Sequence, residues 1–290
     1  MKLVVKISDG LGNQIFQYAF ARSLECKYKG KVYLDVSDIN NTRGKNKSEL
    51  MEQRKYGHRD YTLDKFRIVL PVAKTKTVSK WDYIYKNSID SEIIRQASSI
   101  GLYPWRCIEE QDLYNNPKVC PLFSSYYKGY WFDLKYYSGI RSILQNEFHL
   151  KRKLKLPRDI KYLLDNRIVN AVHVRRGDFL KIGRNISEKD YYEKAISYMN
   201  RRVPDNSVYF IFSDDILWVK SNMRFPGNPI FISEMGFSDF EEFAIMRACS
   251  NFIIANSTFS YWPAYLHDGG IVVSPRKWRT KITPDGWVCL

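Results

Sequence analysis

The sequence lacks several features that mark particular classes of protein. No apolar run approaches the roughly 18 residues of a membrane-spanning helix. Met1 leads into LVVKI without the hydrophobic region of a signal peptide, so a cytoplasmic protein is expected. The five cysteines are scattered and form no CxxC pair, which argues against a disulfide framework and against a zinc site. These absences leave a globular protein with reduced thiols as the expected class.

Acidic residues are scarce relative to basic ones. With 46 Lys and Arg against 31 Asp and Glu, the chain carries a formal net charge of +15, and its partners are expected to be anionic. Basic clusters lie at residues 43–47, 151–158 and 276–281. They are compatible with nucleic acid, with a phosphorylated substrate, or with peripheral contact at the inner, anionic face of the cell membrane. No zinc-finger, homeodomain or RRM signature accompanies the charge, which disfavours nucleic acid.

Strand and helix patterns alternate at the start of the chain. LVVKI (3–7) has the pattern of a buried strand, the loop DGLGNQ follows, and apolar residues from Ile15 to Leu24 recur at helical spacing. KVYLDV (31–36) is the next predicted strand, so the segment forms a β-α-β unit with parallel strands. The stretch from about 40 to 130 is less regular and predicts only helices and loops.

The second half alternates more clearly. Strands are predicted at 167–174, 208–212, 229–233, 251–255 and 270–274. Helices separate them, and two begin with capping boxes, Ser187 with Asp190 and Ser238 with Glu241. This order predicts a second open α/β sheet.

The basic, proline-containing segment KRKLKLPRD is the predicted domain boundary. It divides an α/β chain into two Rossmann-like domains, residues 1–155 and 156–290, with mostly parallel sheets that face one another across a cleft. The extreme C-terminus is expected to pack back on the first domain.

Polar clusters follow three of the predicted strands in the second domain. HVRRGD (173–178), SDD (213–215) and ANST (255–258) each stand at the carboxyl end of a strand. Ligands bind at those ends in open parallel sheets, so the three clusters are expected to converge on one ligand.

Arg175 and Arg176 predict an anion site within this group. A planar guanidinium donates to phosphate oxygens in a bidentate geometry. Neighbouring side chains on a strand point to opposite faces, so one arginine is expected to reach the ligand while the other pairs with an acid such as Asp178. Asp178 is interpreted as an orienting partner or cap, and His173 as a structural residue or a ligand contact.

The ANST cluster has two interpretations. Backbone N–H groups and hydroxyls at Ser257, Thr258 and Ser260 can bind an anion at a helix N-terminus. Alternatively, Asn256 or Ser257 simply caps that helix. Anion binding is the interpretation that the neighbouring arginines favour.

The SDD cluster is open to three interpretations. Asp214 and Asp215, next to Ser213, can be metal ligands, ribose or base contacts, or ordinary turn residues. No DxD motif occurs in the sequence, so a divalent metal is not indicated.

The opening glycine loop resembles part of a dinucleotide fingerprint. Gly10 and Gly12 match the first half of GxGxxG, and Asp35 resembles its ribose-binding acid, which makes an NAD-dependent dehydrogenase an alternative. Ile15 stands where the third Gly or Ala belongs, and the arginine cluster has no role in such an enzyme. Both points argue against the dehydrogenase.

Four segments together resemble a known family: GLGNQIFQYAFARSL, VHVRRGDF, SDDILW and ANSTFSYWPAYL. They are similar to the bacterial α-1,2-fucosyltransferases of glycosyltransferase family 11, inverting enzymes whose family also contains the blood-group H enzymes. YTLDKFRI and GYWFDLKYY resemble further segments in the same order, so the likeness spans nearly the whole chain. HxRRGD alone is less specific, since α-1,6- and protein O-fucosyltransferases have similar motifs, and an α-1,6-like linkage is the alternative.

The resemblance implies a GT-B fold and a GDP-β-L-fucose donor. It implies transfer to the 2-hydroxyl of a terminal galactose, in an oligosaccharide or a lipid-linked glycan, without a metal or other cofactor. Arg175 and Arg176 then supply the positive charge that stabilises the departing diphosphate. The resemblance assigns the remaining donor contacts to Gly10, Gly12, Asn13 and Gln14 of the opening loop, and guanine or ribose contacts to candidates among Asp214, Asp215, Glu234 and Asp239.

Inversion also calls for a base that accepts the proton of the attacking hydroxyl. The α-1,6 enzymes have a glutamate soon after their arginine motif, whereas FLKIGRN (179–185) holds no acid. Asp178 and Asp9 are the candidates, and the alternative is a reaction dissociative enough to need little help from a base. The chain departs from the family pattern at Phe132, Tyr261 and Pro263, which are expected to shape the acceptor pocket.

Overall fold

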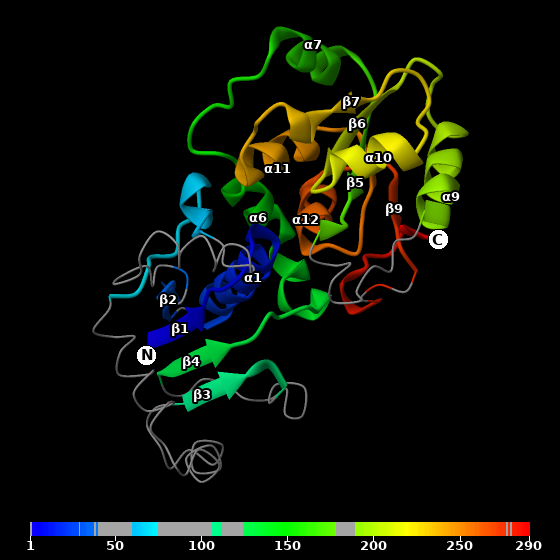
Figure 1. The fold of residues 1–290 in the computed structure, drawn as a ribbon. Helices are drawn as coiled ribbons and strands as arrows, with labels where there is room; N and C mark the ends of the chain where they lie inside the picture. The colour runs from blue at the N-terminus through cyan, green and yellow to red at the C-terminus, as the bar shows by residue number, and fades with distance from the viewer. Residues whose placement is uncertain are drawn as a thin grey trace. The chain divides into compact units, whose positions relative to one another are not determined.

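The computed structural model describes residues 2–28, 30–37, 39, 60–74, 106–111, 124–177, 189–276, 278 and 280–290. These residues form two compact units, each with its own parallel sheet (Figure 1). The first unit comprises Met1–Asp64 and Ile68–Arg141, and the second comprises Lys65–Arg67 and Ser142–Leu290. The predicted α/β class with parallel sheets is confirmed. The units divide after Arg141, whereas the sequence places a boundary after residue 155.

The first unit holds a four-stranded sheet of order β2-β1-β4-β3. All its pairings are parallel, between β1 (Lys2–Lys6), β2 (Lys31–Asp35), β3 (Arg106–Glu109) and β4 (Ser125–Lys128). Helix α1 (Leu11–Tyr28) connects β1 to β2, which confirms the predicted β-α-β unit. The short 3₁₀ helices are η1 (Leu63–Lys65), η2 (Leu134–Tyr136) and η3 (Ser138–Ile140).

Aromatic rings hold α1 against the segment that follows β4. Phe20 stacks on Trp131 with ring centroids 3.8 Å apart, and Phe16 meets Phe132 edge-on at 4.8 Å. All four rings are buried. Each such pair contributes about 1 kcal/mol beyond its buried area. The cluster therefore fixes the chain where it leaves the carboxyl end of β4.

The carboxylate of Glu110 holds the same segment through its backbone. Its Oε2 accepts hydrogen bonds from the N–H groups of Tyr130 and Trp131 at 2.9 Å, and its Oε1 accepts one from Phe132 at 3.1 Å. Trp131 has a φ of 63°, in the left-handed region that bulky side chains rarely adopt. A Cβ added at Gly129 would lie 2.6 Å from the Cβ of Glu110, so this close approach requires glycine.

The second unit holds a six-stranded parallel sheet of order β10-β9-β8-β5-β6-β7. The strands are β5 (Val169–Val174), β6 (Val208–Ser213), β7 (Ile230–Phe231), β8 (Asn251–Ile253), β9 (Val272–Ser274) and β10 (Val288–Cys289). The helices are α6 (Arg141–Glu147), α7 (Arg158–Asn166), α9 (Lys189–Asn200), α10 (Ile216–Asn222), α11 (Asp239–Arg247) and α12 (Thr258–Leu266). Two 3₁₀ helices, η4 (Ile232–Glu234) and η5 (Thr280–Ile282), complete the described elements of this unit.

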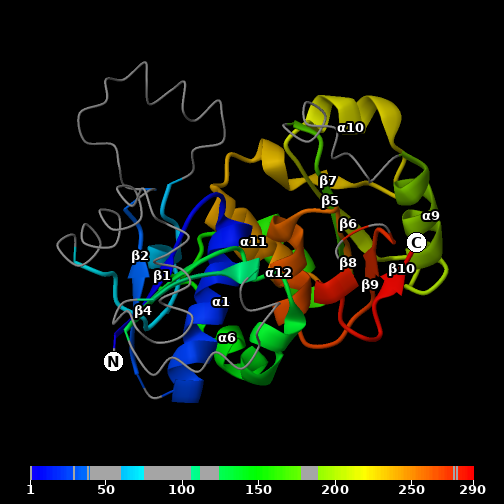
Figure 2. The ribbon, with the colours of Figure 1, turned by 90° about the horizontal axis from the view of Figure 1, so that it is seen from below.

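Helices cover both faces of this second sheet (Figure 2). Val172 and Val174 of β5 share one core with residues of α9 and with Val219 of α10. On the other face, His173 contacts Phe259 of α12 at a ring separation of 5.5 Å. Successive residues of β5 therefore point alternately toward α9 and α10 and toward α12.

The predicted strands of the second half are present, with differences at two places. Residues 229–233 yield only the two-residue β7, because Ile232–Glu234 turns into η4. The sequence predicts no strand at the C-terminus, but Val288–Cys289 pairs with β9. The capping box of Ser238 and Glu241 is confirmed, while Ser187 lies outside the described residues.

Replacing Glu110 by Gln is expected to destabilise the first unit. The amide would present N–H donors to backbone donors, and losing charge-assisted bonds should lower the free energy of unfolding by about 2 kcal/mol. Thermal or urea unfolding measures the change. Glu109→Gln is the matched control, because the contacts of Glu109 with Lys128 at 3.8 Å and with Gln111 at 2.9 Å are side-chain contacts near the surface, which add little stability. Equal stability of the two variants would contradict the role assigned to Glu110.

Candidate functional site

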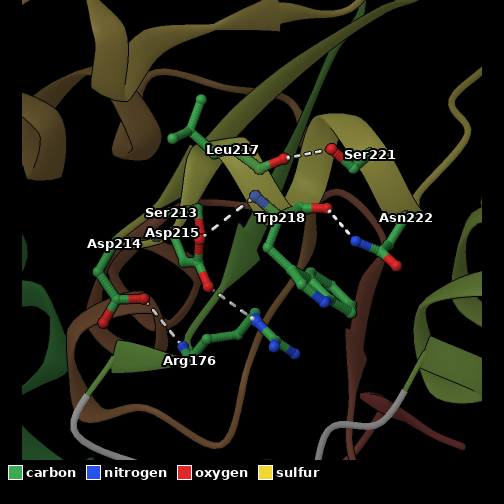
Figure 3. A network of polar contacts seen from close by, with 8 residues as sticks. All are labelled: Arg176, Ser213, Asp214, Asp215, Leu217, Trp218, Ser221 and Asn222. Atoms are coloured by element: carbon green, nitrogen blue, oxygen red, sulfur yellow. Dashed lines mark hydrogen bonds and ion pairs between the residues drawn. The ribbon is translucent and has the colours of Figure 1, made fainter.

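The carboxyl ends of β5 and β6 bring two of the predicted polar clusters together (Figure 3). Parallel pairing sets Val174 beside Ser213. The arginines that follow β5 therefore meet the aspartates that follow β6. Two ion pairs result, and they give the two arginines different surroundings.

Arg176 is held between an acid and an aromatic ring. Its Nε donates to Oδ2 of Asp215 at 3.2 Å, and its guanidinium carbon lies 3.5 Å from the ring centroid of Trp218 (Figure 3). Asp215 also caps α10 by accepting a hydrogen bond from the Trp218 N–H at 3.3 Å. Arg176 is thus packed on α10, with Asp215 in the role expected for Asp178. Asp178 itself lies outside the described residues.

Arg175 forms an ion pair with Asp214. Its Nη1 lies 2.9 Å from Oδ2 of Asp214, whose Oδ1 accepts the backbone N–H of Arg176 at 2.9 Å. The charge of Arg175 also contributes to lowering the pKa of His173, after the larger effect of burial. Arg175 therefore belongs to the electrostatic surroundings of His173.

Gly177 permits the close approach of Asp214. A Cβ at this position would lie 2.6 Å from Oδ2 of Asp214, the atom that pairs with Arg175. Because both carboxylate oxygens are engaged, the carboxylate has no unhindered way to move aside. The glycine of the RRG sequence is therefore a steric requirement of the ion pair.

His173 carries an unsatisfied buried nitrogen. The side chain is 5% exposed, and burial lowers its pKa to about 3, so the ring is neutral at physiological pH. Its Nδ1 is buried and finds no hydrogen-bond partner among the described residues. Such an orphaned atom at a strand end is a natural contact for a ligand atom.

The start of α12 forms the third predicted cluster. Ser257 is the N-cap, and its side chain accepts a hydrogen bond from the Phe259 N–H at 3.3 Å. The capping interpretation therefore holds for its hydroxyl. Asn256 and Ser260 are buried, whereas Thr258 is partly exposed in the first turn. The N–H groups of that first turn form the positive end of the helix dipole.

The four acids considered for guanine or ribose differ in what engages them. Asp214 and Asp215 hold the arginines, and Glu234 pairs with Lys220, whose Nζ lies 2.7 Å from both carboxylate oxygens. Asp239 is exposed at the start of α11. Three of the four acids therefore already form ion pairs with Arg or Lys side chains of this protein.

Glu242 is an acid that the sequence analysis missed. Burial raises its pKa to about 7, and the charge of Asp239 adds to the shift while a hydrogen bond with Ser233 opposes it. Ser233 in turn accepts the backbone N–H of Ser213 at 3.1 Å, so Glu242 is linked to the end of β6. The sequence holds one signal of this role: Glu241 forms the capping box, so the adjacent Glu242 is not needed as a cap.

In the first unit, Gln14 is a structural residue. The side chain is fully buried, and its Nε2 donates to the carbonyls of Asp9 at 2.7 Å and Asp60 at 2.9 Å. Its Oε1 accepts the Thr62 N–H at 3.1 Å. These bonds engage both the N–H groups and the carbonyl of the amide, and they hold Gln14 to residues 9, 60 and 62 of its own unit. Of the other loop residues, Gly10 and Asn13 are partly exposed and Gly12 is buried.

Two further polar residues of this unit are also structural. Gln17, which the sequence analysis missed, accepts the Ser8 N–H at 2.8 Å and donates to the carbonyl of Gly129 at 3.3 Å. Asp35 is buried and accepts hydrogen bonds from Tyr126 at 2.6 Å and the Ser37 N–H at 2.9 Å. Asp35 is therefore unsuited to bind a ribose, which removes support from the dehydrogenase alternative.

The three departures from the family pattern lie in the core. Tyr261 is fully buried and stacks on Tyr265 at 5.5 Å, and Pro263 is buried inside α12. Phe132 is 8% exposed and packs on Phe16. All three pack within their own units, and their expected part in the acceptor pocket stays a prediction.

The described part of the chain contains neither a metal cluster nor a membrane-spanning helix. No group of three or more His, Cys, Asp and Glu in the described ranges is arranged to hold a metal ion. No described helix is both long and apolar enough to cross a bilayer.

Replacing Gly177 by Ala is expected to displace Asp214 and weaken both arginine contacts. The melting temperature should fall by about 4 °C, the shift that about 1 to 2 kcal/mol produces in a chain of this size. Gly139→Ala is the matched control, because nothing lies within 4 Å of a Cβ there. Calorimetry of both variants tests this, and a Gly177→Ala protein as stable as the control would rule out the steric argument.

Comparison with known sequences identifies the family. The sequence profile of glycosyl transferase family 11 matches residues 2–281. The O-antigen biosynthesis glycosyltransferase WbnK of Escherichia coli is 30% identical, over 98% of this chain and 99% of that protein. The alpha-1,2-colitosyltransferase of Escherichia coli is also 30% identical, over 99% and 98%. A galactoside alpha-(1,2)-fucosyltransferase 2 of Rattus norvegicus is 28% identical over 35% of this chain and 30% of that one.

Solved structures agree on the fold. Arabidopsis thaliana FUT1, as a mutant in complex with GDP, aligns with a TM-score of 0.52 at 12% identity, over 98% of this chain and 72% of that chain. The fucosyltransferase NodZ from Bradyrhizobium aligns with a TM-score of 0.50 at 14% identity, over 93% and 94%. The predicted GT-B-like α/β fold is thereby confirmed. The chain belongs to glycosyl transferase family 11, and it is a glycosyltransferase.

Proposed function

We propose that this enzyme transfers L-fucose from GDP-β-L-fucose to the 2-hydroxyl of a terminal galactose, with inversion. The observation that carries the proposal is the turn after β5, where Asp214 pairs with Arg175 at the carboxyl end of the strand that holds His173. The family adds support, because its members include enzymes named for α-1,2 transfer of fucose and of colitose.

In the proposed reaction, Arg175 stabilises the leaving group. As the bond between the anomeric carbon and the β-phosphate oxygen breaks, negative charge grows on GDP. A guanidinium already fixed by Asp214 needs no reorganisation to meet that charge. The first turn of α12, beginning at Thr258, adds N–H donors and a favourable dipole. These fixed charges support catalysis without a divalent metal.

The nucleoside is assigned to His173 and Glu242. The orphaned Nδ1 of His173 supplies one hydrogen-bonding atom. Glu242 is a carboxyl at the same sheet edge that no described cation pairs with, and its carboxylate can accept N–H donors from guanine or hydroxyls from ribose. Asp214, Asp215 and Glu234 are less suitable, since chain cations already hold them.

Colitosyl transfer is the second candidate. The observation in its favour is the colitosyltransferase that matches this chain over 99% of its length, at the same 30% identity as the glycosyltransferase WbnK. Colitose is the 3-deoxy counterpart of L-fucose, so a GDP-linked donor would use the same phosphate contacts. The two donors differ only in the 3-hydroxyl, which fucose has and colitose lacks. A site that hydrogen-bonds this hydroxyl distinguishes them.

The acceptor is proposed to be a galactose-terminated oligosaccharide or lipid-linked glycan at the cytoplasmic face of the membrane. The basic segment 151–158 supports peripheral contact there, because its Lys and Arg side chains are exposed.

A donor panel tests the function. With a galactoside acceptor and EDTA present, GDP-fucose is expected to yield an α-1,2-linked product, while UDP-galactose and CMP-sialic acid yield none. GDP-colitose in the same panel separates the two candidates, because a site that uses the 3-hydroxyl should prefer fucose by about 10-fold or more. Mass and linkage analysis provide the measurement. Equal turnover of UDP-sugars, or activity restored only by Mn²⁺ or Mg²⁺, would contradict the proposal.

The two arginines should respond differently to substitution. Arg175→Ala is expected to lower kcat about 10²-fold or more and to weaken GDP binding, with little change in melting temperature. Arg175→Lys should recover only part of the loss, because an ammonium lacks the bidentate geometry. Arg176→Ala should mainly lower the melting temperature, since it loses Asp215 and the Trp218 ring.

The measurements are kcat, GDP affinity by calorimetry and thermal melting. Arg158→Ala, at an exposed position at the start of α7, is the control for loss of a surface arginine. Two well-folded, fully active alanine variants at 175 and 176 would show that this motif does not stabilise the leaving group.

A further inference from the structure

A long connection at the margin of the second unit joins α6 to β5 (Figure 1). It leaves the core at Lys151, whose N–H donates to the carbonyl of Lys65 at 2.9 Å, and it returns at Val169, the first residue of β5. Helix α7 lies within this connection, and Ile160 is the one buried residue among its nine. We call residues 151–168 the α7 segment. Most of its side chains are exposed.

The α7 segment carries a dense positive charge. Seven of its residues are Lys or Arg and two are Asp, and all of these side chains are exposed. Lys161 forms an ion pair with Asp165, whereas no carboxylate of the described residues pairs with the other six cations. The seven are Lys151, Arg152, Lys153, Lys155, Arg158, Lys161 and Arg167. Exposed charge of this density attracts an anionic surface over roughly 8 Å at physiological ionic strength.

Apolar side chains lie among these cations. Tyr162 is 58% exposed and Ile168 is 39% exposed. Ile160, Leu163 and Leu164 have the i, i+3, i+4 spacing by which a surface helix turns an apolar stripe to the core, yet only Ile160 is buried. The leucines that stay partly exposed in the segment are Leu154, Leu156, Leu163 and Leu164. The segment therefore presents apolar surface that the core of the unit does not cover.

This combination of charge and apolar surface favours a membrane over nucleic acid. The phosphates of a nucleic acid would engage the Lys and Arg side chains but not the leucines. An anionic bilayer engages both, because its headgroups attract the cations and the boundary of its acyl chains accepts apolar side chains. Tyrosine is enriched at that boundary. With nine residues, α7 is far shorter than the roughly 20 residues of a spanning helix, so the contact is peripheral.

We propose that the α7 segment docks this protein on a bilayer that contains anionic phospholipids. Its cations lie at the headgroup phosphates, and Tyr162 and the neighbouring leucines enter the boundary of the acyl chains. The proposal rests on the function proposed above for the lipid-linked acceptor. It extends the membrane contact from the basic residues 151–158 to α7, and it names the class of lipid.

Sedimentation of the full chain with lipid vesicles tests the docking without any sugar. Vesicles of phosphatidylcholine with a third of phosphatidylglycerol are expected to bind the protein about 100-fold more tightly than phosphatidylcholine alone. That binding should fall about tenfold or more between about 0.1 M and 0.5 M salt, because salt screens the attraction. Equal binding to both kinds of vesicle would overturn the proposal.

Removal of three cations tests the charge of the segment. A protein with Lys153→Gln, Lys155→Gln and Arg158→Gln should bind anionic vesicles about 100-fold more weakly, because each Lys or Arg near an anionic surface contributes about fivefold. Its melting temperature and its kcat with a soluble galactoside should stay at the wild-type values, since all three side chains are exposed.

A second triple variant is the matched control. Lys194→Gln, Arg276→Gln and Lys281→Gln remove the same charge from exposed positions of the second unit outside the α7 segment. This protein should bind anionic vesicles within about threefold of the wild type, because charges away from the contact are screened. Equal losses in the two triple variants would show that only the net charge matters, which contradicts a defined docking surface.

Replacement of Tyr162 tests the apolar part of the contact. Tyr162→Ser removes an exposed ring, so the melting temperature should stay within about 2 °C of the wild type. Vesicle binding should weaken about fivefold, and it should do so in high salt as well, because burial of the ring is not screened. Leu217→Ser is the matched control, since Leu217 is 79% exposed on α10 and lies outside the segment. Unchanged binding of Tyr162→Ser would overturn the proposed insertion.

The outcomes separate the docking from the proposed function. A protein that binds anionic vesicles but transfers no sugar from any GDP-sugar keeps the docking surface and loses the proposed function. An active protein that binds no anionic vesicles loses only the docking. Tighter binding to a short oligonucleotide than to anionic vesicles, weakened by the three substitutions in the α7 segment, would make this a nucleic-acid surface and would overturn the proposal.

Discussion

The carboxylate of Asp214 is the contact on which the polar edge of the second unit depends. It engages Arg175 with one oxygen and the backbone N–H of Arg176 with the other, at 2.9 Å each. A single exposed ion pair of this kind would add little stability. Two bonds to one partly buried carboxylate, however, define the direction in which the chain leaves β5. The two arginines then have different partners, Asp214 for Arg175 and Asp215 with the Trp218 ring for Arg176.

The organisation of this edge was largely predictable from local patterns. Alternating apolar runs predict the strands of the second half, and the rule that parallel strands end at one edge predicts that HVRRGD and SDD meet. β-strand alternation predicts that only one of the two arginines pairs with an acid, whereas both do, Arg175 with Asp214 and Arg176 with Asp215. These features depend on residues close together in the chain or on a general property of parallel sheets.

The features that escaped prediction depend on contacts between distant residues. The hydrogen bond from the Tyr130 hydroxyl to Asp9 joins residues 121 positions apart, and the bonds that bury Gln14 reach Asp60 and Thr62. An Asn-Gln pair beside a glycine loop predicts a ligand contact, and the sequence gives no sign of the hydrogen bonds that Gln14 makes within its own unit. The pKa of Glu242 likewise follows from burial by neighbours that no periodic pattern reveals. Short strands such as β10 carry too few residues for any periodicity to show.

The hydrogen bonds from the chain after β4 to Glu110 constrain how such sequences can diverge. The carboxylate can reach three successive N–H groups only because position 129 has no side chain, since a Cβ there would lie 2.6 Å from the Cβ of Glu110. If Glu110 is lost, nothing requires the left-handed backbone at Trp131. If position 129 gains a side chain, its Cβ displaces Glu110. Neither change is accessible alone without passing through a less stable intermediate. The two positions should therefore be inherited as a pair, and a lineage that abandons one should be found to have abandoned both.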